Sequence, residues 1–253
     1  MSNITAAFQN GKGYIPFFVC GDPDLATTAA AVRSAVANGA AMVELNIPFS
    51  DPTAGDPAIQ DANIRALRSG VTTDQIFEFV TELRRDITVP ILISGYANVV
   101  FSYGIDRFAG QCAQRGIDGL IIPDLPFEEQ EEFLPACRKY GIDLISMVAI
   151  TSQERIKAIA RSATGFLYIM ACPGGSTQSL ADIVTTVRSV SDIPCAVCLS
   201  ADDAPQFWET AALVDGVVED GPIVSLFGRY GTAAPRHVGA HTRRILQQLR
   251  AIP

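Results

Sequence analysis

The sequence predicts an α/β protein built as a single (β/α)8 TIM barrel domain over residues 1–253. Eight short runs rich in Val, Ile, Phe and Leu recur along the chain, and stretches with helical spacing of apolar residues lie between them. The runs are continuously apolar, which is typical of parallel strands buried on both faces. An open doubly wound sheet is the alternative, but the Gly-rich turn expected after an early strand of that fold does not occur.

The predicted strands follow from the positions of these apolar runs. In chain order they lie at 14–20, 42–47, 90–95, 118–122, 143–149, 165–170, 194–199 and 214–218. Branched and aromatic residues, which fit the pleated surface of a sheet, dominate most of them.

The segments between the runs predict helices. Helical spacing places them at 25–38, 73–85, 105–115, 128–139, 153–162, 179–190 and 204–212, with a closing helix over 235–250. Thr72 and Gln75 form a capping box before the second of them. An acidic run over 128–132 opens the fourth after Pro126, where negative charge favours a helix N-terminus.

Composition excludes several classes of protein. The chain carries 19 Lys and Arg against 27 Asp and Glu, a net charge of −8 with no basic stripe, so a nucleic-acid partner is not expected. A hydrophobic content of 48% excludes disorder. No apolar run approaches the ~18–20 residues that span a membrane, and the N-terminus lacks the order of a signal peptide. We therefore expect a cytoplasmic protein without a membrane partner.

The cysteines and histidines predict neither a disulfide framework nor a metal site. The six cysteines lie scattered through apolar segments, as reduced thiols do: Cys20, Cys112, Cys137, Cys172, Cys195 and Cys198. Cys195 and Cys198 form a CxxC pattern within a predicted strand, where positions three apart face opposite ways. His237 and His241 are four apart on the closing helix without the Glu of a zinc-protease motif, so a surface or packing role is expected.

Glu44 is the sharpest candidate for chemistry. It interrupts an apolar strand, and a buried carboxylate is costly unless it is protonated or partnered. Met42, Glu44 and Asn46 share one face of that strand. If this face lines the barrel, apolar walls would raise the pKa of Glu44 toward the range of a general acid or base. The alternative is a Glu that bridges to a neighbouring strand or helix.

Other candidates lie just inside or after the predicted strands, where barrels place their active sites. Two are candidate catalytic residues, Asp56 and Tyr168, and the rest are candidate substrate-binding residues: Phe17, Asn46, Tyr96, Met170, Ser200, Glu219 and Asp220. Ordinary turn chemistry is the alternative for Asp56, and a core position is the alternative for the tyrosines. The turn over 174–176 is a weak anion-binding signal.

Four motifs resemble the tryptophan synthase α subunit family. They are FFVCGDPD at 17–24, VELNIPFSDP at 43–52, GYANVVFSYGIDRF at 95–108 and GLIIPDLPFEE at 119–129. The similarity runs in order from about residue 5 to 250. It implies a (β/α)8 barrel that cleaves indole-3-glycerol phosphate to indole and glyceraldehyde 3-phosphate. The implied reaction is a retro-aldol step without cofactor, in complex with a PLP-dependent β subunit.

The resemblance also implies roles for single residues. Glu44 matches the catalytic glutamate that protonates the indole C3 carbon, and Phe17, Tyr96 and Tyr168 match residues that line the indole pocket. The family's second catalytic carboxylate falls at Gly55 here, so the acid has moved one place, to Asp56. Asn46 stands where the family has Gly, which adds bulk beside Glu44.

The family's phosphate-binding glycines are also altered. The corresponding segments are 174–177, 198–202 and 220–222, and two of the three no longer match. Pro222 removes an amide donor, and Glu219 with Asp220 would place negative charge beside a phosphate dianion. The sequence alone therefore predicts poor binding of a glycerol phosphate tail.

These departures favour a divergent enzyme as the first hypothesis. Glu44 would act as acid or base in a carbon–carbon lyase, isomerase or cyclase, with Tyr168 or Asp56 assisting. Its substrate would be a small, non-phosphorylated molecule of specialised metabolism. One alternative is a true tryptophan synthase α subunit that cleaves indole-3-glycerol phosphate. The other is a non-catalytic barrel that binds and regulates a partner resembling a β subunit.

Overall fold

The computed structural model describes residues 2–52, 57–149, 151–170, 177–199 and 204–252. Its strands pair in parallel in the order β5-β4-β3-β2-β1-β9-β8-β7-β6. The two strands at the ends of this order, β5 (Asp143–Leu144) and β6 (Ser146–Val148), are separated by Ile145 alone. They are two halves of one strand, so the sheet closes on itself. The (β/α)8 barrel is confirmed, and the open doubly wound sheet is wrong.

The remaining strands all overlap the predicted runs. They are β1 (Gly13–Val19), β2 (Val43–Asn46), β3 (Ile91–Ser94), β4 (Gly119–Ile121), β7 (Leu167–Ile169), β8 (Cys195–Leu199) and β9 (Gly216–Glu219). Strand β9 extends one residue beyond its predicted end, which places Glu219 within the sheet.

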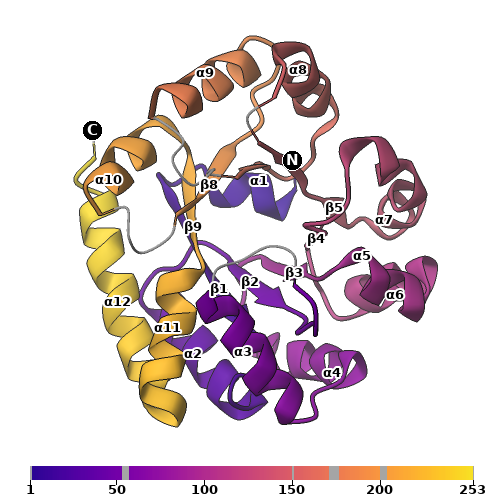
Figure 1. Ribbon diagram of the computed structural model, residues 1–253, viewed down its shortest axis with the longest axis vertical. Coiled ribbons are helices and arrows are strands. Elements are labelled where there is room, and N and C mark those ends of the chain that lie inside the picture. Colours follow the sequence, from indigo (N-terminus) through magenta and orange to yellow (C-terminus); the bar gives the residue numbers. More distant parts are fainter. Residues whose placement is uncertain (1, 53–56, 150, 171–176, 200–203, 253) are drawn as a thin grey trace.

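Most helices also lie where periodicity predicts them, as a ring around the strands (Figure 1). They are α2 (Leu25–Ala37), α4 (Thr73–Leu83), α6 (Ile105–Gln114), α7 (Leu134–Tyr140), α8 (Gln153–Ser162), α9 (Thr177–Arg188), α10 (Ala204–Leu213) and α12 (Ala234–Leu249). The capping box of Thr72 and Gln75 is present.

The helix predicted over 128–139 is divided in two. Its acidic part is a 3-10 helix, η1 (Phe127–Glu132), and α7 begins only at Leu134. The cause is Pro135 in the first turn of α7, because proline has no amide hydrogen to continue a preceding helix but is well suited to start a new one.

Four α-helices of the described residues lie where the sequence predicts no helix. They are α1 (Asn3–Ala7), α3 (Pro57–Arg68), α5 (Ala97–Tyr103) and α11 (Gly221–Tyr230). The first and third have 5 and 7 residues, too few to show a helical period. Pro222 lies in the first turn of α11, where its missing amide hydrogen costs nothing, so it begins a helix there.

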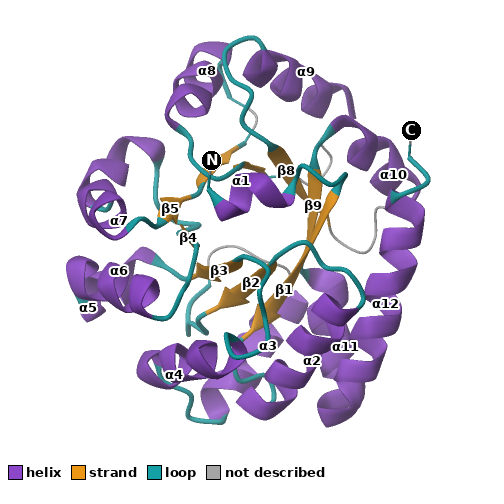
Figure 2. Ribbon diagram, turned by 180° about the vertical axis from the view of Figure 1, so that it is seen from behind, coloured by secondary structure: helices purple, strands orange, loops and turns teal. Residues whose placement is uncertain are grey.

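Two apolar layers hold the barrel together. Outward side chains of the strands pack against the helices, and inward side chains fill the barrel. Helix α1 lies inside the ring of helices (Figure 2) and adds Ile4 to the inner layer, where it packs with Ile15, Met42 and Leu92. A Cβ at Gly216 would lie 2.5 Å from the ring of Phe8, so glycine is required where α1 meets the strands. Helix α1 therefore closes the end of the barrel at which the strands begin.

Shortening Ile4 should destabilise the barrel measurably. We expect Ile4→Ala to lower the free energy of unfolding by about 3 kcal/mol, because Ile4 is 0% exposed and its removal leaves a cavity. The matched control is Ile64→Ala, since Ile64 is 46% exposed and its truncation should cost less than about 1 kcal/mol. Urea unfolding of the two variants tests this, and equal losses would contradict the closing role of α1.

The two cysteines of the CxxC pattern lie on opposite faces of β8, as the sequence predicts. Cys195 belongs to the outer layer and Cys198 packs against the inner one, so the two thiols face opposite sides of β8. Both are free, as are the other cysteines that the structure describes; Cys172 lies outside the described residues. In the described part of the chain, no helix is both long and apolar enough to cross a membrane.

Candidate active site

Glu44 lies inside the barrel, on the face of β2 that the sequence predicts. Strand pairing sets Phe17 of β1 and Leu92 of β3 beside it, on the same side of the sheet. Met42, two residues earlier, belongs to the inner layer, whereas Val43 and Leu45 pack outward. Since Glu44 is only 3% exposed, a carboxyl group stands within an apolar barrel near its mouth.

Burial controls the electrostatics of Glu44. The pKa of the carboxyl group is raised from 4.5 to about 8: burial is the largest cause, a hydrogen bond with Ser94 opposes the rise, and the charge of Asp220 adds to it. The Oε2 atom is buried and has no hydrogen-bond partner among the described residues. Near neutral pH this group holds a proton in a dry site, so it is suited to give that proton to a substrate.

Polar groups face Glu44 from the other side of the barrel. Tyr168 of β7 belongs to the inner layer, and burial raises its pKa well above 10.0, with the charges of Cys198, Glu44 and Asp220 adding to the shift. The Cys198 thiol shares hydrogen bonds with Tyr168 and Asp220. The structure thus brings together three predicted site residues, Glu44, Tyr168 and Asp220. It adds Cys198 to this group. Only the alternation of side chains along β8 could have indicated that Cys198 points into the barrel.

Asn46 belongs to a hydrogen-bonded group between β2, β3 and α3. Its amide nitrogen lies 3.4 Å from Asn63 Oδ1, and the Ser94 hydroxyl lies 3.4 Å from Asn46 Oδ1. Asn63 also accepts a hydrogen bond from the Phe49 amide at 2.9 Å, and Phe49 stacks on Tyr96 with ring centroids 4.9 Å apart. Asn46 and Tyr96 are therefore joined through the segment that follows β2.

Helix α3 packs over the mouth next to β1. Its buried residues form one cluster with two inward residues of β1 and one of α11: Phe17, Val19, Ile59, Ala62, Ala66 and Val224. An ion pair holds the helix there, because Arg65 donates two hydrogen bonds of 2.7 Å to the buried Asp22 in the turn after β1. Phe17 thus lies beneath α3 at the edge of the site.

The structure separates Glu219 from the other candidates. The Tyr14 hydroxyl donates a hydrogen bond to Glu219 Oε2 at 2.5 Å, and His241 of α12 also contacts this oxygen. The side chain therefore points out of the barrel, so the prediction that Glu219 lies at the mouth and binds substrate is wrong. The reason is strand alternation: Val218 faces inward, so Glu219 faces outward. Asp220, the N-cap of α11, follows the end of the strand and hydrogen-bonds to Cys198 on the inner side.

The remaining candidates are only partly described. Met170 follows β7 and is 36% exposed. Asp56, Ser200 and the turn over 174–176 lie outside the described residues. Within the described part of the chain, no group of three or more His, Cys, Asp or Glu side chains could hold a metal ion.

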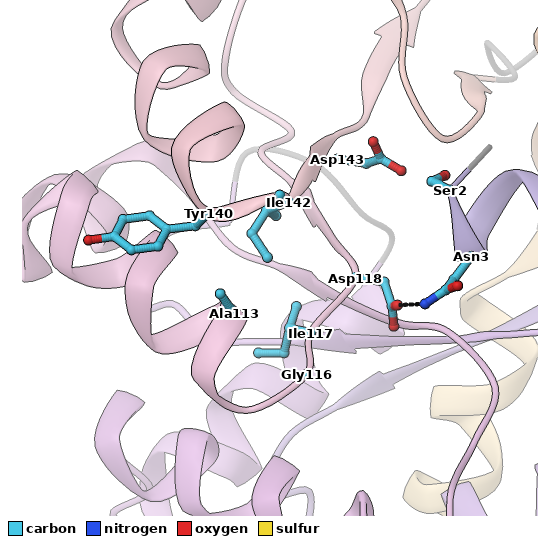
Figure 3. A pocket seen from close by; sticks show the side chains of 10 residues that line it. Ser2, Asn3, Ala113, Gly116, Ile117, Asp118, Tyr140, Ile142 and Asp143 are labelled. Carbon is cyan, nitrogen blue, oxygen red and sulfur yellow. Dashed lines mark hydrogen bonds between the residues drawn. The ribbon is translucent and has the colours of Figure 1, made fainter.

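A separate pocket of about 350 Å³ is lined by residues that precede β4 and β5, at the end of the barrel where the strands begin. Figure 3 shows the side chains that line it. The N-terminus of α1 and the turns before β4 and β5 line it. Asn3 crosses it to donate a hydrogen bond to Asp118 at 3.0 Å, and Asp118 is also paired with Arg84. The polar side chains of this pocket thus hold α1 against the barrel, at the end away from Glu44.

Comparison with known proteins gives one consistent result. A family model described as the tryptophan synthase alpha chain matches residues 4–248. The tryptophan synthase alpha chain of Lacticaseibacillus casei is 38% identical over 251 residues, covering 97% of this chain and 94% of the relative. That of Citrifermentans bemidjiense is 41% identical over 242 residues, covering 91% of each.

Solved structures agree with the relatives. Tryptophan synthase subunit alpha from Legionella pneumophila superposes with a TM-score of 0.91 at 29% identity, covering 100% of both chains. A structure of the tryptophan synthase α2β2 complex from Pyrococcus furiosus matches with a TM-score of 0.84 at 28% identity, covering 94% of this chain and 98% of that one.

These similarities overturn the hypothesis of a divergent enzyme of specialised metabolism. At 38% and 41% identity over nearly the whole chain, the relatives are alpha chains of tryptophan synthase, which fits amino-acid biosynthesis instead. The structure also removes one reason to expect that a phosphorylated substrate is rejected, because the Glu219 side chain points away from the mouth and adds no negative charge there.

Proposed function

The chain belongs to the tryptophan synthase alpha chain family, and on that premise we propose that it cleaves indole-3-glycerol phosphate to indole and glyceraldehyde 3-phosphate. The observation that carries this proposal is Glu44, a protonated carboxyl group inside an apolar barrel. The reaction is a retro-aldol cleavage, for which one group that gives and takes a proton is sufficient, without a cofactor.

Glu44 would act twice in this reaction. It first gives its proton to C3 of the indole ring. The resulting carboxylate then accepts the proton of the hydroxyl group next to the C3 bond. That bond breaks as the aldehyde forms, its electron pair returns to the ring, and Glu44 regains its starting state. A pKa of about 8 lets the group hold the proton at neutral pH and still release it.

Other residues would bind the substrate. Phe17 and Tyr96, both largely buried, would supply aromatic surface for the indole ring, and Tyr168, which interacts electrostatically with Glu44 and Asp220, would assist at the reacting end. Asp220 is held at the start of α11, where its carboxylate accepts a hydrogen bond from the Gly221 amide at 2.5 Å. Asp56 remains our candidate for a second catalytic carboxylate that assists Glu44.

Further candidates complete the proposed binding site. Asn46 lies two residues beyond Glu44 on the same inward face of β2, so it would limit the space beside the acid. Met170 and Ser200 follow β7 and β8, and they remain candidates for contact with the substrate.

We also propose a protein partner that resembles a tryptophan synthase β subunit. The support is a solved structure of the α2β2 complex of Pyrococcus furiosus, one chain of which this chain resembles over nearly its full length. Besides Met170, three large apolar side chains are exposed on the described surface and are our candidates for such a contact: Ile64, Leu67 and Phe101.

The direct test is to incubate the purified chain with indole-3-glycerol phosphate and follow indole release by chromatography. We expect stoichiometric formation of indole and glyceraldehyde 3-phosphate, and a faster rate when a β subunit from a related bacterium is added. Chelator should leave the rate unchanged. A folded chain that releases no indole, alone or with the β subunit, would support the non-catalytic alternative and contradict the proposed reaction.

A further inference from the structure

Glu219 ends strand β9, and its carboxyl group is buried between the sheet and α12. It is 3% exposed, and its Oε2 atom lies 2.5 Å from the Tyr14 hydroxyl and 2.6 Å from His241 Nε2. A buried carboxylate is costly unless donors surround it. Both donors meet one oxygen atom here, so β1, β9 and α12 are joined at that point.

Arg244 determines where the protons of this group lie. One of its guanidinium nitrogens is 3.1 Å from His241 Nδ1, and a guanidinium group can only donate. His241 Nδ1 must therefore accept, which places the ring proton on Nε2, facing Glu219. Burial raises the pKa of Tyr14 well above 10.0, so its hydroxyl keeps its proton. Glu219 is accordingly an acceptor of two hydrogen bonds from neutral donors.

The next residue along the chain belongs to the candidate active site. Asp220 acts electrostatically on Glu44 and Tyr168, and its carboxylate caps the first amide of α11. Asp220 follows the last residue of β9 and is the N-cap of α11, so an anchored Glu219 fixes the backbone from which the Asp220 side chain reaches Cys198. Helix α12 does not line the barrel, yet through His241 it contacts the residue beside Asp220.

We propose that Glu219 is a positioning residue, whose hydrogen bonds to Tyr14 and His241 hold Asp220 and the start of α11 in place opposite Glu44. This inference rests on the proposed function only for its kinetic test. It gives the closing helix, far along the chain, a role in the geometry of the barrel mouth.

Two substitutions of His241 provide the kinetic test. His241→Ala removes the donor to Glu219, and we expect kcat for indole release to fall about tenfold while KM changes less than about twofold, since small misplacements act mainly on the transition state. His241→Gln should restore kcat to within about twofold of the wild type, because its terminal amide can replace the Nε2 donor.

His237 supplies a matched control on the same helix. It lies one turn before His241 and is also beside an arginine, with Arg236 Nε 3.1 Å from its Nε2, but it stacks on Tyr230 at 3.6 Å instead of contacting Glu219. His237→Ala should leave kcat and KM unchanged.

A second readout does not depend on the reaction. The Cys198 thiol shares a hydrogen bond with Asp220, so displacement of Asp220 should change its alkylation by iodoacetamide, mapped by mass spectrometry. We expect His241→Ala to accelerate alkylation of Cys198 severalfold, and His237→Ala to leave it unchanged. If the wild type releases no indole, the proposed function is wrong. The alkylation rates of Cys198 in the two variants still show whether His241 and Glu219 hold Asp220 in place.

Three results would overturn the proposal. One is an unchanged alkylation rate of Cys198 in a folded His241→Ala variant. Another is a His241→Gln variant as impaired as His241→Ala. The third is a changed alkylation rate with an unchanged kcat in an active enzyme, because the position of Asp220 would then not matter to the reaction.

Discussion

Glu44→Gln is expected to lower kcat for indole release by about 10³-fold, because the variant cannot give a proton to the indole ring or accept one from the substrate hydroxyl. The Gln side chain has nearly the same size and still fits between Phe17 and Leu92 of the neighbouring strands. KM should therefore change little, and the loss should appear almost entirely in kcat. Steady-state kinetics of the wild type and the variant measure both quantities.

A second carboxylate provides the control for this experiment. Glu82 is 55% exposed and forms an ion pair with Arg85 on the surface of α4. Glu82→Gln makes the same carboxyl-to-amide replacement far from the barrel mouth, so kcat should stay at the wild-type value. Circular dichroism should show both variants folded. A folded Glu44→Gln variant with more than a tenth of the wild-type kcat would remove Glu44 from the mechanism.

The sequence was sufficient to predict that Glu44 lies inside the barrel, because a single acid stands in an apolar strand. Once the barrel closes, one face of each strand must line its interior, and the face that Glu44 shares with Met42 and Asn46 is the one that does so. The same reasoning placed Cys195 and Cys198 on opposite faces of β8, as the structure has them. The alternation of side chains along a strand is therefore enough to predict which residues share a face.

Glu219 and Asp220 show where that reasoning stops. Two adjacent acids at the end of a strand must face opposite ways, but composition does not say which one faces inward. The answer depends on Tyr14 and His241, which lie about 200 and 20 residues away in the chain and meet Glu219 only in the folded barrel. Contacts between residues so far apart in the chain leave no recognisable pattern in the sequence around Glu219.

Helix α3 illustrates a different limit. Its place over the mouth is held by Arg65 and Asp22, residues 43 positions apart, and by packing of Ile59 and Ala62 on Phe17. The sequence shows an ordinary segment after a Pro- and Gly-rich loop. Which barrel positions receive an additional helix is decided by tertiary packing and not by helical period.

The pH dependence of stability provides the second large expected effect. Burial raises the pKa of Glu44 in the folded chain from 4.5 to about 8. Between these values the unfolded chain has lost the proton and the folded chain still holds it, so a rise in pH favours unfolding. The contribution of Glu44 to the free energy of unfolding should fall by about 1.4 kcal/mol per pH unit over this window. Below pH 4.5 the folded and unfolded chains both hold the proton, and above pH 8 both have lost it. Outside this window Glu44 therefore no longer makes the free energy of unfolding depend on pH.

Glu44→Gln isolates this effect, because glutamine does not titrate and every other group is shared with the wild type. We therefore expect the variant to gain stability relative to the wild type by about 4 kcal/mol between pH 5 and pH 8. Urea unfolding at these two pH values measures the difference. The loss of activity and the gain in stability would then have one origin, a carboxyl group that the barrel keeps protonated at the cost of stability. A stability difference that is the same at both pH values would show that Glu44 is solvated or ionised in the folded chain.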